Sequence, residues 1–295
     1  MSHCRKKETN KATLLGLAGN ATLAGMKFVA GVAGNSSAMI ADAVHSLSDL
    51  GTDLFTLLTL RISCRPKDKN HKYGHGKVET LATAFMGFFI AFVGIGVLAN
   101  SVINIINHYS GNPLATPGWI AFGAALLSFA IKEFLYRYNL YVGRKFSSKV
   151  VQANAWNHRS DAYSSIAATL GIGGAILLGP NWVILDPIAA IVVSFFILKV
   201  SVSMTKDALL ELIETSLPKA QEKEIISIAS GVSGVNNPHE LKTRKVGNDI
   251  AIDLHIQVDR NLNVDQAHDI TVELEKCLCD AYGKETHISI HIEPL

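Results

Sequence analysis

The chain has 295 residues, of which 48% are hydrophobic and 18% charged, and its 27 Lys and Arg against 25 Asp and Glu leave a net charge of +2. This composition excludes a disordered chain, which needs low hydrophobicity and high charge. It also argues against a single soluble globule, in which roughly 25% of residues are charged. The near-neutral balance argues against a nucleic-acid partner, and four Cys are too few for a disulfide scaffold.

Six apolar stretches occupy the first two thirds of the chain. They reach the length of about 20 residues that a helix needs to cross a bilayer core. No short apolar segment with a cleavage site precedes them, so we expect no cleaved signal peptide. We therefore predict an α-helical membrane domain of six transmembrane helices over residues 1–208, with spans near 12–33, 37–62, 78–107, 116–136, 152–178 and 183–205.

The connections between these stretches differ in charge. The N-terminal tail and the second and fourth connections carry Lys and Arg, whereas the connections at 34–37, 109–117 and 179–183 carry none. Positive charge stays cytoplasmic. We expect a multi-pass protein of the cell (inner) membrane with both termini in the cytoplasm. The basic residues are Arg5, Lys6, Lys7, Lys11, Arg61, Arg65, Lys67, Lys69, Lys72, Lys77, Arg137, Arg144, Lys145 and Lys149.

Residues 209–295 are predicted to form a small cytoplasmic α+β domain. Helical spacing covers 220–230 and 264–282, whereas 249–259 and 287–292 alternate apolar and polar residues as half-buried strands do. A third strand is expected at 239–246. The order α-β-β-α-β predicts helices packed on a small sheet. Cys277 and Cys279 are two apart on a helix and point in different directions, so we interpret both as packing residues.

The second span contains Asp42, His45, Asp49 and Asp53. An ionisable group at the bilayer centre costs about 2.5–3.5 kcal/mol on insertion scales, so such residues are retained for a reason. His45 and Asp49 are four residues apart and share one helix face. Asp53 extends that face toward the cytoplasm, and Asp42 is a further candidate for the same cavity.

In the fifth span, Asn157 and Asp161 repeat the four-residue spacing. Two helices that each offer two ligands predict a four-coordinate metal site. Imidazole and carboxylate are ligands of Zn²⁺, and an amide oxygen shifts the preference toward Mn²⁺ or Fe²⁺. His158 is the alternative to Asn157, as ligand, supporting group or proton carrier. The other interpretation of both pairs is helix–helix contact or a proton relay.

Two further groups of polar residues fit metal binding. Asp68, His71 and His75 lie within eight residues of the second connection, where the alternative is a solvated loop. The C-terminal domain contains His239, His255, His268, His287 and His291, which suggest one or two metal sites or else surface histidines. We find no phosphate-binding glycine motif and no nucleophile–base set, so we predict no enzyme and no cofactor.

Four segments carry a resemblance to a known family: SAMIADAVHSLSDL, RPKDKNHKYGHGKVETLA, ANAWNHRSDAYSS and the final HIEP. Over nearly its whole length the chain resembles the cation diffusion facilitator (cation efflux) family of metal/proton antiporters. The segment AWNHRSDA looks like the magnetosome-associated and iron-linked branches. The resemblance implies six spans, a cytoplasmic metallochaperone-like (ferredoxin-like) domain, and a homodimer with an interlocking charge pair at Lys77 and Glu214.

The resemblance also implies three metal sites. The transport site falls on His45, Asp49, Asn157 and Asp161, where the zinc branch has Asp-x-x-x-Asp with His-x-x-x-Asp. The loop site falls on Asp68, His71 and His75. The cytoplasmic binuclear site falls on His239, His255, His268, His291 and Glu293, with Glu in place of the family's Asp. His287 has no counterpart in the family.

The resulting expectation is efflux of a divalent transition metal, Zn²⁺ or Fe²⁺ and then Mn²⁺, coupled to proton antiport. The metal is both substrate and regulator, because metal on the cytoplasmic domain is expected to stabilise the dimer. The alternative hypothesis is a membrane scaffold or metal sensor that transports little and recruits partners through its cytoplasmic tail.

Overall fold

The computed structural model describes residues 2–63, 68–145, 149–247 and 249–295. Side chains are described from residue 18 onward, except those at 53, 56–63, 149, 150, 153 and 154. The chain divides into two compact units, residues 1–54 with 86–203 and residues 55–85 with 204–295. The predicted division at 208/209 stays a prediction, since the unit that holds the sheet also contains residues 55–85.

Several side chains that entered the sequence predictions lie outside the described set. They are those of Cys4, Arg5, Lys6, Lys7, Lys11, Asp53, Arg61, Cys64, Arg65, Lys67 and Lys149.

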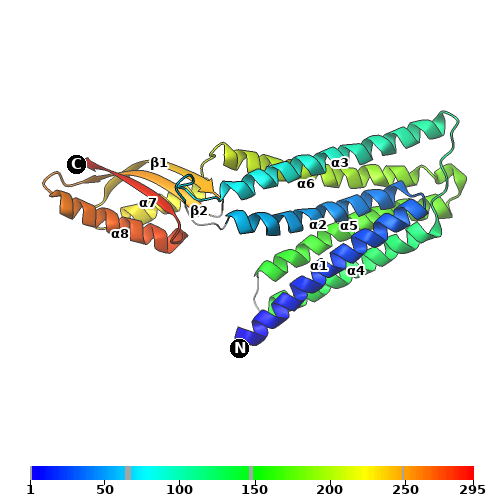
Figure 1. The fold of residues 1–295 in the computed structure, drawn as a ribbon, viewed down its shortest axis with the longest axis horizontal. Coiled ribbons are helices and arrows are strands. Elements are labelled where there is room, and N and C mark those ends of the chain that lie inside the picture. Colours follow the sequence, from blue (N-terminus) through cyan, green and yellow to red (C-terminus); the bar gives the residue numbers. More distant parts are fainter. Residues whose placement is uncertain (1, 64–67, 146–148, 248) are drawn as a thin grey trace. The chain divides into compact units, whose positions relative to one another are not determined.

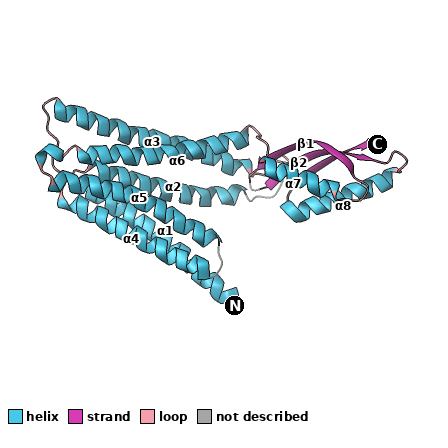
Figure 2. Ribbon diagram, turned by 180° about the vertical axis from the view of Figure 1, so that it is seen from behind, coloured by secondary structure: helices cyan, strands magenta, loops and turns pink. Residues whose placement is uncertain are grey.

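Six long helices correspond to the six apolar stretches (Figure 1). Within the first unit, the first, fourth and fifth helices pack against one another, as Figures 1 and 2 both show. A short 3₁₀ turn, η1 (Pro180–Trp182), precedes the sixth helix. The helices are α1 (Ser2–Ala33), α2 (Ser37–Ser63), α3 (Lys77–Tyr109), α4 (Trp119–Lys145), α5 (Lys149–Leu177) and α6 (Leu185–Leu212).

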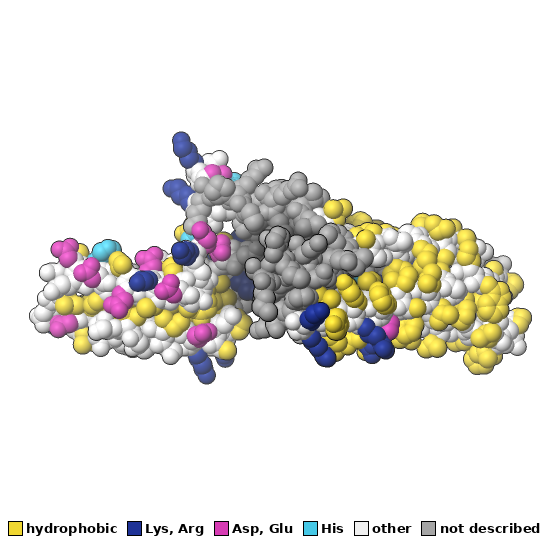
Figure 3. All heavy atoms as spheres, turned by 90° about the horizontal axis from the view of Figure 1, so that it is seen from below, with side chains coloured by type: hydrophobic (Ala, Val, Ile, Leu, Met, Phe, Trp, Pro, Cys, Tyr) yellow, Lys and Arg dark blue, Asp and Glu magenta, His cyan; other side chains and the backbone are white. Residues whose placement is uncertain are grey.

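Within the described residues, three segments are long and apolar enough to cross a membrane: Lys77–Tyr109, Trp119–Lys145 and Pro180–Leu212. Six spans therefore stay a prediction. The candidate site residues in α2 and α5 lower the apolar character of those helices. On the face shown in Figure 3, hydrophobic side chains cover the helices of the first unit, and most Asp and Glu in view lie on the second.

Small residues bring the helices of the first unit close together. A buried cluster of mostly alanines, including Ala38, Ala121 and Ala168, joins five of them, α1, α2, α4, α5 and α6. Small side chains let helix backbones approach closely. Asp186 at the start of α6 accepts hydrogen bonds from Ser36 Oγ and the Ser37 backbone N–H, both at 2.6 Å. This contact fixes the first turn of α2 and therefore the position of the polar residues farther along it.

The second unit contains a three-stranded sheet with two helices, in the predicted order α-β-β-α-β. The middle strand pairs antiparallel with the first and parallel with the third. Its Ile252, Leu254 and Ile256 are buried against Ile225 and Leu274 of the two helices. The elements are α7 (Lys219–Ser230), β1 (Asn236–Val246), β2 (Asp249–Val258), α8 (Val264–Tyr282) and β3 (His287–Pro294).

Candidate metal centres

Three predicted site residues from two helices meet inside the first unit. His45 Nε2 lies 3.9 Å from Asp49 Oδ2 and 3.9 Å from Asp161 Oδ1. One ligand atom from each residue falls within 4.8 Å of the others. His45 is 8% exposed, so the imidazole is largely withdrawn from solvent. One imidazole and two carboxylates from facing helices form a set that suits a divalent transition metal.

The carboxylate of Asp161 has a second partner that the sequence analysis did not identify. Lys132 of α4 places its Nζ 2.6 Å from Asp161 Oδ2 and donates to Asn20 Oδ1 of α1 at 2.7 Å. Lys132 is only 1% exposed. The sequence did offer one signal for this partner, a lysine within an apolar stretch. Residue spacing along one helix, however, does not show which neighbouring helix faces that lysine.

The fourth proposed ligand has two candidates on α5. The Asn157 side chain is exposed, whereas His158 is buried, and neither of its ring nitrogens has a hydrogen-bond partner among the described residues. The described group of three does not include His158. Asn157 keeps the four-residue spacing to Asp161, so both assignments stay predictions.

Asp42 belongs to a separate buried network. Its Oδ2 lies 2.7 Å from Lys27 Nζ, and both side chains are fully buried. The two carboxylate oxygens accept hydrogen bonds from Ser164 and Ser165 of α5, while Lys27 also donates to Ser46. The network ties α1, α2 and α5 together. Lys27, like Lys132, is a charged residue in an apolar stretch that the sequence analysis did not single out.

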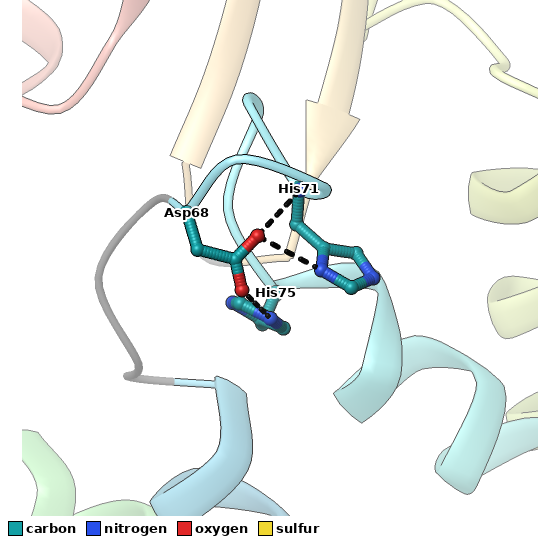
Figure 4. A group of neighbouring side chains, drawn as sticks. All are labelled: Asp68, His71 and His75. Carbon is teal, nitrogen blue, oxygen red and sulfur yellow. Dashed lines mark hydrogen bonds and ion pairs between the residues drawn. The ribbon is translucent and has the colours of Figure 1, made fainter.

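The loop group also comes together (Figure 4). Asp68 Oδ1 accepts from the backbone N–H of Asn70 and of His71, and Asp68 Oδ2 lies 3.4 Å from His75 Nε2. These backbone donors hold the pKa of the Asp68 carboxyl below its usual value. The rings of His71 and His75 are 4.3 Å apart. The group is formed by turns rather than by a helix, with Gly74 at a positive φ of 83°.

A row of histidines crosses the sheet of the second unit. His239 pairs with His255, and His255 pairs with His291, so one residue from each strand stands in register. His255 Nδ1 and His239 Nε2 lie 3.1 Å and 3.3 Å from the two oxygens of Glu293. The contact with His255 holds the pKa of Glu293 below its usual value. His255 alternates with buried Leu254 and Ile256, so this row lies on the face opposite the helices.

Two other histidines of this unit stand apart from the described group of His239, His255 and Glu293. His268 is exposed on α8 and does not belong to that group. His287 contacts the ring of Tyr73, with centroids 5.3 Å apart. The predicted charge pair is present within one chain, because Lys77 Nζ lies 2.9 Å from Glu214 Oε1. Lys77 lowers the pKa of the Glu214 carboxyl.

Comparison with known families decides the identity. Residues 13–213 match the cation efflux transmembrane domain, and residues 217–295 match the cytoplasmic domain of cation efflux proteins. The chain belongs to the cation efflux family. The resemblance drawn from the four sequence segments is confirmed. Members of this family transport metal cations and are not enzymes, which agrees with the prediction of no enzymatic activity.

Several curated relatives cover most of the chain. Metal tolerance protein C1 of Arabidopsis thaliana is 34% identical over 98% of this chain, which spans 63% of that relative. The manganese efflux system protein MneP of Bacillus subtilis is 29% identical over 100% of this chain and 99% of its own length. The magnetosome protein MamM of Paramagnetospirillum magneticum is 34% identical over 94% of this chain and 85% of its own.

Proposed function

We propose that this cation efflux protein exports a divalent transition metal from the cytoplasm in exchange for protons. The observation that carries the proposal is the meeting of His45, Asp49 and Asp161, from α2 and α5, within 4.8 Å. Transporter sites commonly lie near the bilayer midplane between helices that rock around them. Family membership supports metal transport, and the position of the group between α2 and α5, with His45 buried, supports a site inside the membrane.

Metal and protons are proposed to compete for the same three side chains. A metal ligand must lose its proton before it binds, so metal affinity falls as the local pH falls. Protons that enter from the outer side then release the ion there. The empty, protonated site returns to the cytoplasmic side, which couples the two fluxes.

For the transported ion we propose Fe²⁺ or Mn²⁺ ahead of Zn²⁺. Relative to the zinc pattern, His45 replaces a carboxylate and Asn157 replaces an imidazole. An amide oxygen is a harder ligand than an imidazole nitrogen and suits Mn²⁺ and Fe²⁺. The relatives include a manganese efflux system protein and a magnetosome protein, and these similarities support the same order.

The cytoplasmic groups are proposed as regulatory sites in a homodimer. His239, His255, His291 and Glu293 present imidazole and carboxylate groups on the face of the sheet away from the helices, where the first two and Glu293 are partly buried. We propose His268 for the same site, with metal binding or the second protomer bringing it into position. Both termini are proposed to be cytoplasmic, and the location to be the cell (inner) membrane.

The test is metal uptake into proteoliposomes that bear a pH gradient, with Zn²⁺, Fe²⁺ and Mn²⁺ compared. Gradient-dependent flux of one ion, lost in Asp49→Ala and retained in Asp207→Asn, supports antiport and names the substrate. Asp207 is an exposed acid on α6 and serves as the matched control. Absence of flux for all three ions, with metal still bound by the cytoplasmic domain, points to the sensor or scaffold hypothesis instead.

A further inference from the structure

Lys132 is the one charged group among the described contacts of Asp161 that is neither a proposed metal ligand nor exposed. Its Nζ lies 2.6 Å from Asp161 Oδ2, while Asp161 Oδ1 points toward His45 at 3.9 Å. The two oxygens of one carboxylate thus serve two different cations, a fixed ammonium and, in the proposed function, a metal ion.

The ammonium changes the charge that a metal ion meets. Asp49 and Asp161 supply two negative charges, and Lys132 returns one positive charge, so these three groups together carry one negative charge. Like charges a few ångströms apart repel far more strongly at the effective dielectric of a partly buried site than they do in water. Lys132 cannot move its charge into bulk water without leaving a position that is 1% exposed.

We propose that Lys132 is a tethered competitor that keeps metal binding at this site weak enough for release. With no metal bound, the positive charge of the Lys132 ammonium balances the negative charge of the Asp161 carboxylate. When metal binds Asp161 Oδ1, the ammonium remains near it and lowers the affinity by repulsion. This inference rests on the proposed function, since it assigns His45, Asp49 and Asp161 as the substrate site, and it identifies the residue that sets how tightly that site holds its substrate.

The other buried lysine does not share this role. Lys27 lies 2.7 Å from Asp42, which is three residues before His45, and serine hydroxyls surround the pair. Asp42 lies outside the described group of three metal-binding candidates. The charge of Lys27 is therefore matched within its own network, whereas among the described residues the charge of Lys132 is matched only by Asp161, a proposed ligand.

A merely supporting role for Lys132 predicts the opposite effect. Partners that orient a metal ligand raise metal affinity, and their loss typically costs about 10–100-fold in affinity. A competitor lowers affinity, so its removal tightens binding. The sign of the change in Kd after removal of the ammonium distinguishes the two roles without any measurement of transport.

The experiment is equilibrium titration of the purified full chain with Mn²⁺ in a background of Asp68→Asn, His239→Ala and His255→Ala, which removes the two cytoplasmic groups, with Lys132 unchanged or replaced as Lys132→Gln or Lys132→Arg, and with Lys199→Gln, each checked for folding by thermal melting. Lys199 is an exposed lysine on α6 and controls for the loss of one charge. We expect Lys132→Gln to tighten binding at least about tenfold, and the other two variants to stay within about threefold of wild type. In transport assays, Lys132→Gln is expected to lower both KM and kcat, because tighter binding slows release.

Unchanged or weaker Mn²⁺ binding by folded Lys132→Gln overturns the proposal. If this variant does not fold, Lys132→Met, which leaves no buried amide, takes its place in the same titration. Asp49→Ala distinguishes a failure of the proposed metal site from a failure of the proposed role of Lys132. If wild type and Asp49→Ala bind Mn²⁺ equally, the site in the proposed function is wrong; if only Asp49→Ala loses binding and Lys132→Gln matches wild type, only the role of Lys132 is wrong.

Discussion

His45 Nε2 is equally far, at 3.9 Å, from an oxygen of Asp49 on its own helix and from an oxygen of Asp161 on α5. Two ligands each about 2.1 Å from a tetrahedral ion lie roughly 3.4 Å apart. His45 therefore needs to close on each of the two carboxylates by only about half an ångström to share one ion with it. We therefore expect these side chains to bind the transported ion together.

Asp49→Ala and Asp161→Ala are each expected to abolish metal transport. Each substitution removes a carboxylate ligand and leaves the other side chains of the group too few to hold a divalent ion. Uptake into proteoliposomes measures the effect, and thermal melting confirms that both proteins fold. Wild-type flux in either folded variant means that the ion crosses by another route.

Asn157→His is expected to shift the preference toward Zn²⁺. The substitution restores the imidazole of the zinc pattern at the position four residues before Asp161, and imidazole favours Zn²⁺ over Mn²⁺. Competition between Zn²⁺ and Mn²⁺ for uptake measures the shift. The companion variant is His158→Ala. If selectivity is unchanged in the first variant and transport is lost in the second, the buried His158 is the ligand.

Breaking the pair between Lys27 and Asp42 is expected to destabilise the helix bundle. Removal of one partner leaves a buried charge uncompensated, which typically costs about 3–5 kcal/mol. Lys27→Met and Asp42→Asn should each lower the thermal midpoint strongly, and the double variant should recover most of the loss. Melting in detergent gives the three midpoints. Additive effects in the double variant would falsify the coupling between the two residues.

Metal binding at the loop group is expected to weaken as the pH falls, because a histidine must lose its proton before it binds a metal ion. The pKa of Asp68 is held below its usual value, so this carboxylate loses its charge only at a pH below its ordinary titration range. A carboxyl whose pKa is lower in the folded than in the unfolded state stabilises the fold when the pH is above its unfolded pKa. This stabilisation is lost as the pH falls through its folded pKa.

This pH dependence is measurable by Zn²⁺ titration of the full chain from about pH 5 to 8. Asp49→Ala together with His239→Ala and His255→Ala in one background removes the other two groups, so the remaining signal comes from the loop. Asp68→Asn in the same background should remove it at every pH. Binding that persists unchanged at the acid end argues against His71 and His75 as ligands.

Periodicity along the chain was sufficient to predict the elements. The range 264–282 matches α8, whose start is fixed by a capping box between Asn263 and Gln266. The alternation in 249–259 placed His255 on the face away from Leu254, as β2 shows. The four-residue spacing in α2 correctly predicted that His45 and Asp49 share a face.

The partners across helices were beyond the sequence analysis. Spacing tells which side chains share a face, but the face that a neighbouring helix presents depends on packing. For this reason Lys132 was not linked to Asp161, and Asp42 was named as a candidate for the cavity without its partner Lys27. The loop group likewise depends on turns around Gly74 that no period describes.

The pairing of Lys27 with Asp42 also bears on how the chain enters the bilayer during synthesis. If α1 spans the bilayer as predicted, Lys27, six residues before the end of that helix, opposes its insertion as a lone helix, because a charged side chain is costly in the membrane. Its carboxylate partner is only fifteen positions away, on the very next helix, across a turn at Gly34 and Asn35. In the predicted six-span topology, we expect α1 and α2 to leave the translocation machinery together as a hairpin in which the two charges neutralise each other, and the serines of α5 to complete the network when that helix follows.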